Sequence, residues 1–177
     1  MKRKIVFFIV LLFLSACESI EKKAAYEQID ADELVEHIDA YVGKPIAVEG
    51  KIVHVCAVDG FKMKLHTPKG EILKIVPADS SIRFDKSFNN KLVQVIGIAN
   101  ETRISKTQID QLEQEKTLLC HIDYTPCKDS LWVQRQFENG NAEDLAKRDI
   151  ANLRLKSADK NYVSQITIEA TAIKMKE

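Results

Sequence analysis

The hydrophobic residues first repeat at helical spacing in the stretch from Ile29 to Gly43. Asp30 is well placed as an N-cap, and Glu33, three residues later, completes the pattern of a capping box. Gly43 is suited to end the helix, because glycine readily adopts the left-handed conformation common just after a helix. We therefore expect an N-terminal helix whose apolar stripe packs into a core, the stripe being Leu34, Val35, Ile38, Tyr41 and Val42.

After Pro45 the apolar residues alternate with polar ones, which is typical of β-strands with one buried face. Asp59-Gly60 is a strong turn signal between the first two of these strands. Gly50 and Gly97 stand in the middle of strands, where glycine predicts a bulge or sharp coiling. The predicted strands cover residues 45–56, 61–66, 72–76 and 91–101.

Residues 105–161 interrupt this β pattern and indicate helices. Ile109 and Leu112 favour a short helix, and Asn141 is placed to cap a longer one with a single apolar face. The alternation returns in residues 162–175, which we expect to form the last strand. Its buried side is predicted to hold Ile166, Ile168, Ala170 and Ala172.

The order of the elements is three strands, a short helix around Phe84 and Phe88, a fourth strand, a helical excursion and a closing strand. This is the wiring of an OB-fold barrel. The expected fold is therefore mainly β with added helices (α+β). It consists of a five-stranded OB-like barrel with an N-terminal helix and a helical excursion, about residues 105–161, before the last strand.

Three segments carry a resemblance to a known family: Glu49–Cys56, Phe84-Asp85 and Val93–Gly97. They resemble the small OB domains of bacterial envelope lipoproteins, which are grouped with the anticodon-binding-type OB domains. The resemblance implies a binding module. It does not imply a ligand, because OB domains bind oligonucleotides and oligosaccharides and a fold alone does not fix a function.

The N-terminal residues predict that the protein is located in the cell envelope. Residues 1–16 combine a basic start with an apolar run too short to span a bilayer, as in a signal peptide. Leu14-Ser15-Ala16-Cys17 resembles a bacterial lipobox, which implies cleavage before Cys17 and lipid attachment to its thiol. We expect residues 17–28 to be a lipidated tether and residues 29–177 to be the OB-like domain. Glu18 is not the aspartate that often retains lipoproteins in the inner membrane, so we expect the outer membrane.

Charge argues against a nucleic-acid ligand. Residues 1–16 carry three basic residues and no acid, so the remaining chain has 23 basic and 26 acidic residues, a formal net charge of −3. A nucleic-acid-binding protein usually has a strongly basic face. Oligonucleotide binding therefore remains only a second alternative, suggested by the fold family.

The cysteines are the most informative candidates for chemistry. With Cys17 used for lipid, Cys56, Cys120 and Cys127 remain, and an oxidising compartment favours a disulfide. We prefer a Cys56–Cys127 bond, which closes the longer loop and so constrains more chain than a Cys120–Cys127 bond. The alternative is a metal or haem carrier using His54, Cys56 and Cys127, although the usual Cys-x-x-Cys spacing of a structural zinc site is absent. Free thiols are the third possibility.

No catalytic motif is present, and we expect a protein that is not an enzyme. The carboxylates of the excursion are scattered, and no serine has an arranged histidine and aspartate. No cofactor is expected. The single tryptophan, Trp132, is expected to pack the excursion onto the barrel or to lie in a binding surface. The partners implied are the membrane, through the lipid, and an envelope protein or glycan bound without catalysis.

Overall fold

The computed structural model of the protein describes residues 25–56, 58, 60–80 and 82–176. The predicted signal peptide, the predicted lipidation site Cys17 and the first part of the predicted tether lie outside the described residues. So does Asp59 of the predicted turn.

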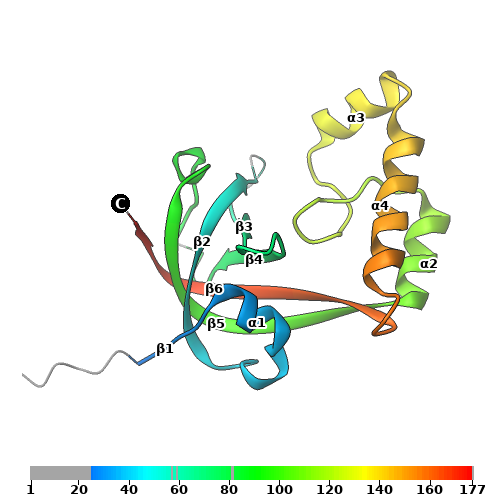
Figure 1. Ribbon diagram of the computed structural model, residues 1–177. Coiled ribbons are helices and arrows are strands. Elements are labelled where there is room, and N and C mark those ends of the chain that lie inside the picture. The colour runs from blue at the N-terminus through cyan, green and yellow to red at the C-terminus, as the bar shows by residue number, and fades with distance from the viewer. Residues whose placement is uncertain (1–24, 57, 59, 81, 177) are drawn as a thin grey trace, which may run out of the picture.

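Five strands form a closed barrel, which confirms the predicted OB-like fold (Figure 1). They are β2 (Pro45–Val55), β3 (Met63–His66), β4 (Ile72–Pro77), β5 (Leu92–Ser105) and β6 (Tyr162–Met175). Their order is β2-β3-β4-β6-β5, and β5 pairs back onto β2 to close the barrel. All pairs are antiparallel except β4 with β6, which is the OB wiring.

Glycine is required in the middle of two strands, for a different steric reason at each position. At Gly97 the predicted bulge is present, because the β5–β6 register shifts between Ile96 and Gly97. A Cβ there would collide with the backbone carbonyl of Glu169, so the two strands can approach only through glycine. At Gly50 itself there is no bulge, because the register of β2 and β3 shifts between Ile52 and His54. Gly50 instead makes room for the side chain of Leu65, which packs against its Cα.

The N-terminal helix forms where the capping residue predicts it. It consists of α1 (Ala31–Glu36), followed by the 3-10 turn η1 (Ile38–Ala40). The Asp30 side chain accepts hydrogen bonds from the backbone N–H groups of Asp32 (2.8 Å) and Glu33 (3.2 Å). Glu33 does not complete a capping box, because its carboxylate accepts a hydrogen bond from the Tyr41 hydroxyl instead.

Two short elements complete the barrel. β1 (Glu27–Gln28) lies in the stretch predicted as tether and pairs in parallel with the start of β2. The predicted helix near Phe84 and Phe88 is the 3-10 turn η2 (Lys86–Phe88).

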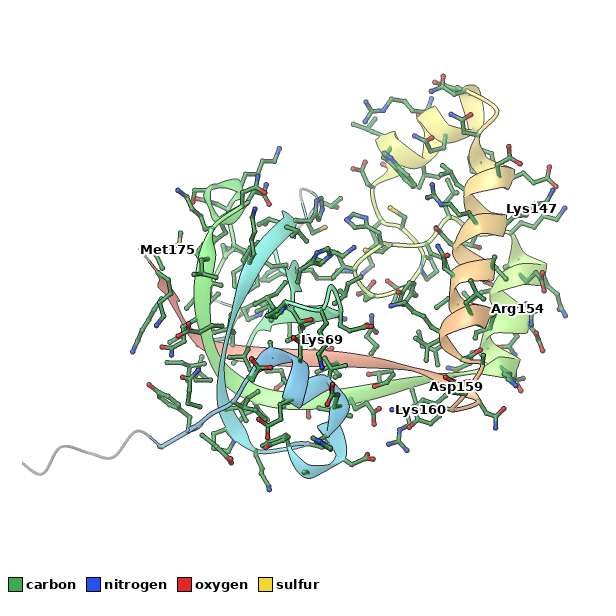
Figure 2. The ribbon with its side chains drawn as sticks, in the orientation of Figure 1. Lys69, Lys147, Arg154, Asp159, Lys160 and Met175 are labelled. Carbon is green, nitrogen blue, oxygen red and sulfur yellow. The ribbon has the colours of Figure 1, made fainter. Side chains whose placement is uncertain are left out.

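Beyond the barrel, β5 and β6 continue side by side as a two-stranded ribbon that carries the helical excursion (Figure 1). Its helices are α2 (Lys106–Glu115), α3 (Ser130–Glu138) and α4 (Ala142–Lys156). Arg154 of α4, labelled in Figure 2, forms ion pairs with Asp110 and Glu113 of α2, at 2.8 and 2.5 Å. Asn141 is the N-cap residue of α4, as predicted, although its side chain makes no capping hydrogen bond.

The buried apolar residues form separate clusters in the barrel and in the excursion. The barrel cluster takes its buried residues from positions 29–99 and 166–170. A second cluster joins α2 and α4 to the outer end of the ribbon, and a third lies between α3 and α4. Within the described residues, no helix is both long and apolar enough to cross a membrane.

Candidate functional site

The segment between α2 and α3, residues 117–129, turns back from the helices toward the barrel (Figure 1). We call it the return loop. Its Asp123 side chain is only 3 % exposed and binds the ammonium groups of Lys62 (2.9 Å) and Lys74 (3.0 Å) on the barrel. Gln165 of β6 adds a hydrogen bond to the carbonyl oxygen of Ile122 (3.1 Å). These contacts hold the return loop against the barrel.

Hydrogen bonds keep Asp123 ionised. Burial alone would raise the pKa of this carboxyl group, but donors from Thr125, Lys62 and Lys74 hold it well below its ordinary value. The Thr125 hydroxyl donates to Asp123 at 2.7 Å within the loop itself. Asp123 therefore stabilises both the internal turn of the return loop and the position of the loop against the barrel.

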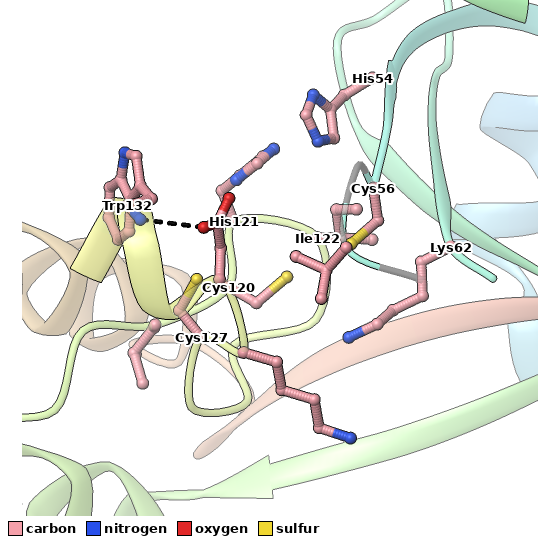
Figure 3. Close-up of a pocket in the computed structure, with 12 residues that line it drawn as sticks. His54, Cys56, Lys62, Cys120, His121, Ile122, Cys127 and Trp132 are labelled. Carbon is pink, nitrogen blue, oxygen red and sulfur yellow. Dashed lines mark hydrogen bonds between the residues drawn. The ribbon is translucent and has the colours of Figure 1, made fainter. Parts of the chain in front are cut away.

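Between the barrel and the return loop lies a pocket of about 230 Å³. Figure 3 shows that its walls come from two sides, with His54 and Cys56 on the barrel side and Cys120 and Cys127 on the loop side. The full lining is His54, Cys56, Val58, Lys62, Leu119, Cys120, His121, Ile122, Cys127, Lys128, Asp129 and Trp132.

The pocket lies between two loops that OB folds use in ligand binding. These folds bind on the face of their second and third strands, together with the loop between the first and second strands and the loop between the fourth and fifth. In this chain the two loops are residues 56–62 and the excursion, 106–161. Both contribute to the pocket walls.

Two histidine rings meet at the pocket. His54 and His121 are 4.4 Å apart between ring centroids and stand edge to face. Burial, followed by the positive charge of Lys64, lowers the pKa of His54. The His121 side chain keeps contact with solvent, yet partial burial and the neighbouring His54 lower its pKa to about 4. Both rings are therefore uncharged at neutral pH.

Two of the charged side chains that line the pocket are engaged elsewhere. Lys62 is paired with Asp123. Asp129 is the N-cap of α3, accepting a hydrogen bond from the backbone N–H of Trp132 at 2.9 Å. With neutral histidines and mostly apolar neighbours, the pocket suits an uncharged apolar group better than an ion.

The structure brings together the candidate residues that the sequence could not place relative to one another. His54, Cys56 and Cys127 all line the pocket, as do Cys120 and His121. Cys56, Cys120 and Cys127 carry free thiols, and the Cys56–Cys127 disulfide stays a prediction. In the part of the chain that the structure describes, no three His, Cys, Asp or Glu side chains are arranged to hold a metal ion.

Sequence reasoning missed the role of Asp123, which it grouped with the scattered carboxylates. No local signal marks it, since its two lysine partners are distant in sequence. Trp132 packs within the excursion, against the cluster between α3 and α4, and not onto the barrel as the first expectation had it. It also lines the pocket.

Comparison with known proteins adds no assignment to this site. No protein-family model matches the chain, and no curated protein matches it significantly.

Proposed function

We propose that the protein is a lipid-anchored, non-enzymatic binding protein of the cell envelope whose pocket receives an apolar side chain of a partner protein. The observation that carries this proposal is the position of the pocket between the two loops that OB folds use for binding. The proposed location in the envelope rests on the lipobox-like Leu14-Ser15-Ala16-Cys17 and the signal-like residues 1–16.

The size and lining of the pocket favour a protein over a glycan. Pockets for drug-sized ligands usually measure about 300–1,000 Å³. At about 230 Å³ this pocket is smaller, and it suits one side chain better than a chain of sugars. Its wall residues include Val58, Leu119, Ile122 and Trp132, which offer apolar contact, and its histidines are neutral.

The single tryptophan provides a direct measurement, because Trp132 lines the pocket. The probes are short peptides with a central Leu or Phe, the same peptides with a central Asp, a muramyl disaccharide and an oligothymidylate. We expect a saturable change in tryptophan fluorescence with the Leu and Phe peptides alone. Saturable binding of only the sugar or the oligonucleotide would overturn the proposal.

Val58 and Val42 form a matched pair for mutation. They are 48 % and 46 % exposed, but only Val58 lines the pocket. Val58→Glu places a charge that the apolar pocket must desolvate, and we expect it to weaken peptide binding at least about tenfold, or about 1.4 kcal/mol. Val42→Glu should leave binding unchanged. Equal affinity of the two variants would refute the pocket as the binding site.

The alternative of a metal or haem carrier using His54, Cys56 and Cys127 is tested on the same preparation. Elemental analysis and the visible spectrum of protein purified without added metal decide it. About one equivalent of metal, or a Soret band, would replace the present proposal.

A further inference from the structure

The cysteines form a cluster that peptide binding does not require. Every cysteine among the described residues, namely Cys56, Cys120 and Cys127, lines the same pocket, and each carries a free thiol. They come from two bodies of the fold: Cys56 follows the end of β2, and the other two lie on the return loop. In Figure 3 the Cys120 side chain lies between those of Cys56 and Cys127.

The backbone of the return loop fixes how its two cysteines are spaced. Leu119 pairs with Pro126 across an isolated antiparallel bridge. On either side of this bridge the N–H of Cys120 donates to the carbonyl of Thr125 (2.7 Å), and the N–H of Cys127 donates to that of Leu118 (2.9 Å). Cys120 and Cys127 are therefore diagonal neighbours on one face of the loop.

Diagonal neighbours in an antiparallel pair have Cα atoms about 7–8 Å apart, whereas a disulfide needs about 4.4–6.8 Å. A bond between Cys120 and Cys127 would thus require the hydrogen-bonded backbone to move. Cys56 faces both of them from the barrel side. The paired backbone of the loop sets no such limit on a bond from Cys56, because Cys56 belongs to the barrel and not to the loop.

We propose that the pocket is a thiol–disulfide exchange site in which Cys56 is bonded alternately to Cys127 and to Cys120. This inference uses the pocket but is independent of its ligand. It gives Cys120 a role, where the sequence predicted only an unpaired thiol beside a fixed Cys56–Cys127 bond.

The first protein disulfide forms when a small disulfide acts as the oxidant. Two protein thiols transfer two electrons and two protons to glutathione disulfide, which gives one protein disulfide and two glutathione thiols. The remaining protein thiol then acts alone: the Cys120 thiolate attacks the Cys56 sulfur, a Cys56–Cys120 bond forms, and Cys127 leaves as the thiolate. The second step moves the bond without net oxidation.

Either bond ties the return loop covalently to the barrel and fills the pocket with a disulfide. The reduced protein therefore has the pocket open for a ligand, and the oxidised protein has it closed. We expect peptide binding to be lost on oxidation and restored by dithiothreitol.

The test maps the bonds in the full-length protein. Reduced protein is incubated with glutathione disulfide at pH 8, and samples taken over time are quenched with acid and N-ethylmaleimide. Digestion with trypsin and Asp-N separates Cys56, Cys120 and Cys127 into the fragments 52–58, 117–122 and 123–128, which are then identified by mass spectrometry. Cys17 falls outside these fragments.

We expect fragment 52–58 to be linked to both loop fragments in the wild type, with the two species interconverting after the glutathione is removed. Cys120→Ala should give only the Cys56–Cys127 species, and Cys127→Ala only the Cys56–Cys120 species. The same oxidation in about 6 M urea is the control and should also yield the Cys120–Cys127 pair.

Three results would overturn the proposal. One is a single Cys56–Cys127 species with Cys120 always alkylated, a second is a dominant Cys120–Cys127 bond in the native protein, and a third is the absence of any linked fragment. None of these results depends on whether a peptide binds, so they are distinct from a failure of the proposed function.

Discussion

His54 and His121 meet ring to ring at the pocket, and both have a lowered pKa. The folded protein therefore resists protonating them, whereas the unfolded chain takes up protons near the ordinary histidine pKa of about 6.5. A lowered histidine pKa stabilises the folded state above about pH 6.5, and this contribution is lost as the pH falls toward about 4. The pocket should thus be sensitive to mild acid.

We expect His121→Gln to flatten the dependence of stability on pH between about pH 6.5 and 4, because glutamine binds no proton. Urea unfolding at several pH values measures this slope. The effect is smaller than for a fully buried histidine, since His121 keeps contact with solvent. His37→Gln is the control, as His37 is exposed and lies away from the pocket, and an equal flattening by this variant would contradict the interpretation.

At the scale of elements, the return loop owes its position to one buried carboxylate. Asp123 connects Lys62, the last residue of the loop after β2, with Lys74 in β4. Removing one member of a buried ion pair costs more than the pair contributes, because the remaining charges stay partly desolvated. The loop, and with it one wall of the pocket, therefore depends on this side chain.

We expect Asp123→Asn to lower the free energy of unfolding by about 3 kcal/mol at neutral pH. The pKa of this carboxyl group is lowered, so its contribution is fully present above about pH 4 and is lost in stronger acid. Urea titration at pH 7 checks the value. Glu36→Gln breaks the exposed Lys69–Glu36 pair and should change little; an Asp123→Asn effect no larger than this would show that the loop is held by other contacts.

The helices and strands also show which parts of the fold can be predicted from sequence patterns alone. The alternation in residues 162–175 predicted β6 with the correct ends. The predicted buried side is correct for Ile166, Ile168 and Ala170, whereas Ala172 is half-buried and the next residue, Ile173, packs against the barrel core. Helix α3 was not predicted, since none of its residues is buried and its apolar side chains form no single stripe. Only the barrel side of the pocket could be predicted from the sequence, because His54 and Cys56 lie on the same predicted strand. The loop side could not be predicted, because the path of the return loop depends on Asp123 and its distant lysine partners.

At the scale of the whole molecule, the barrel and the excursion have separate cores. The barrel cluster contains no buried residue from positions 105–161. The two bodies are connected by the β5–β6 ribbon, in which Thr102 pairs with Gln165. The apolar core of the barrel is therefore built without buried residues from the excursion.

We expect a variant in which an Asn-Gly turn replaces residues 103–164 to fold cooperatively. The turn joins two neighbouring antiparallel strands, and the cut removes Ile104 and Val163, which belong to the core of the excursion. Circular dichroism and urea unfolding measure the outcome. A non-cooperative transition would show that the barrel depends on the excursion, while a folded barrel would also serve as a control that lacks the pocket.

The pairing of β1 with β2 has a consequence for how the protein stands on a surface. The N-terminal chain joins β2 beside Ile46, at its first residues, whereas His54 and Cys56 lie at its last. Ten residues of extended chain span about 30 Å, so attachment and pocket are separated by most of the length of the barrel. A molecule held to a bilayer by its N-terminus would then present the pocket on its distal side, within reach of partners that never touch the lipid.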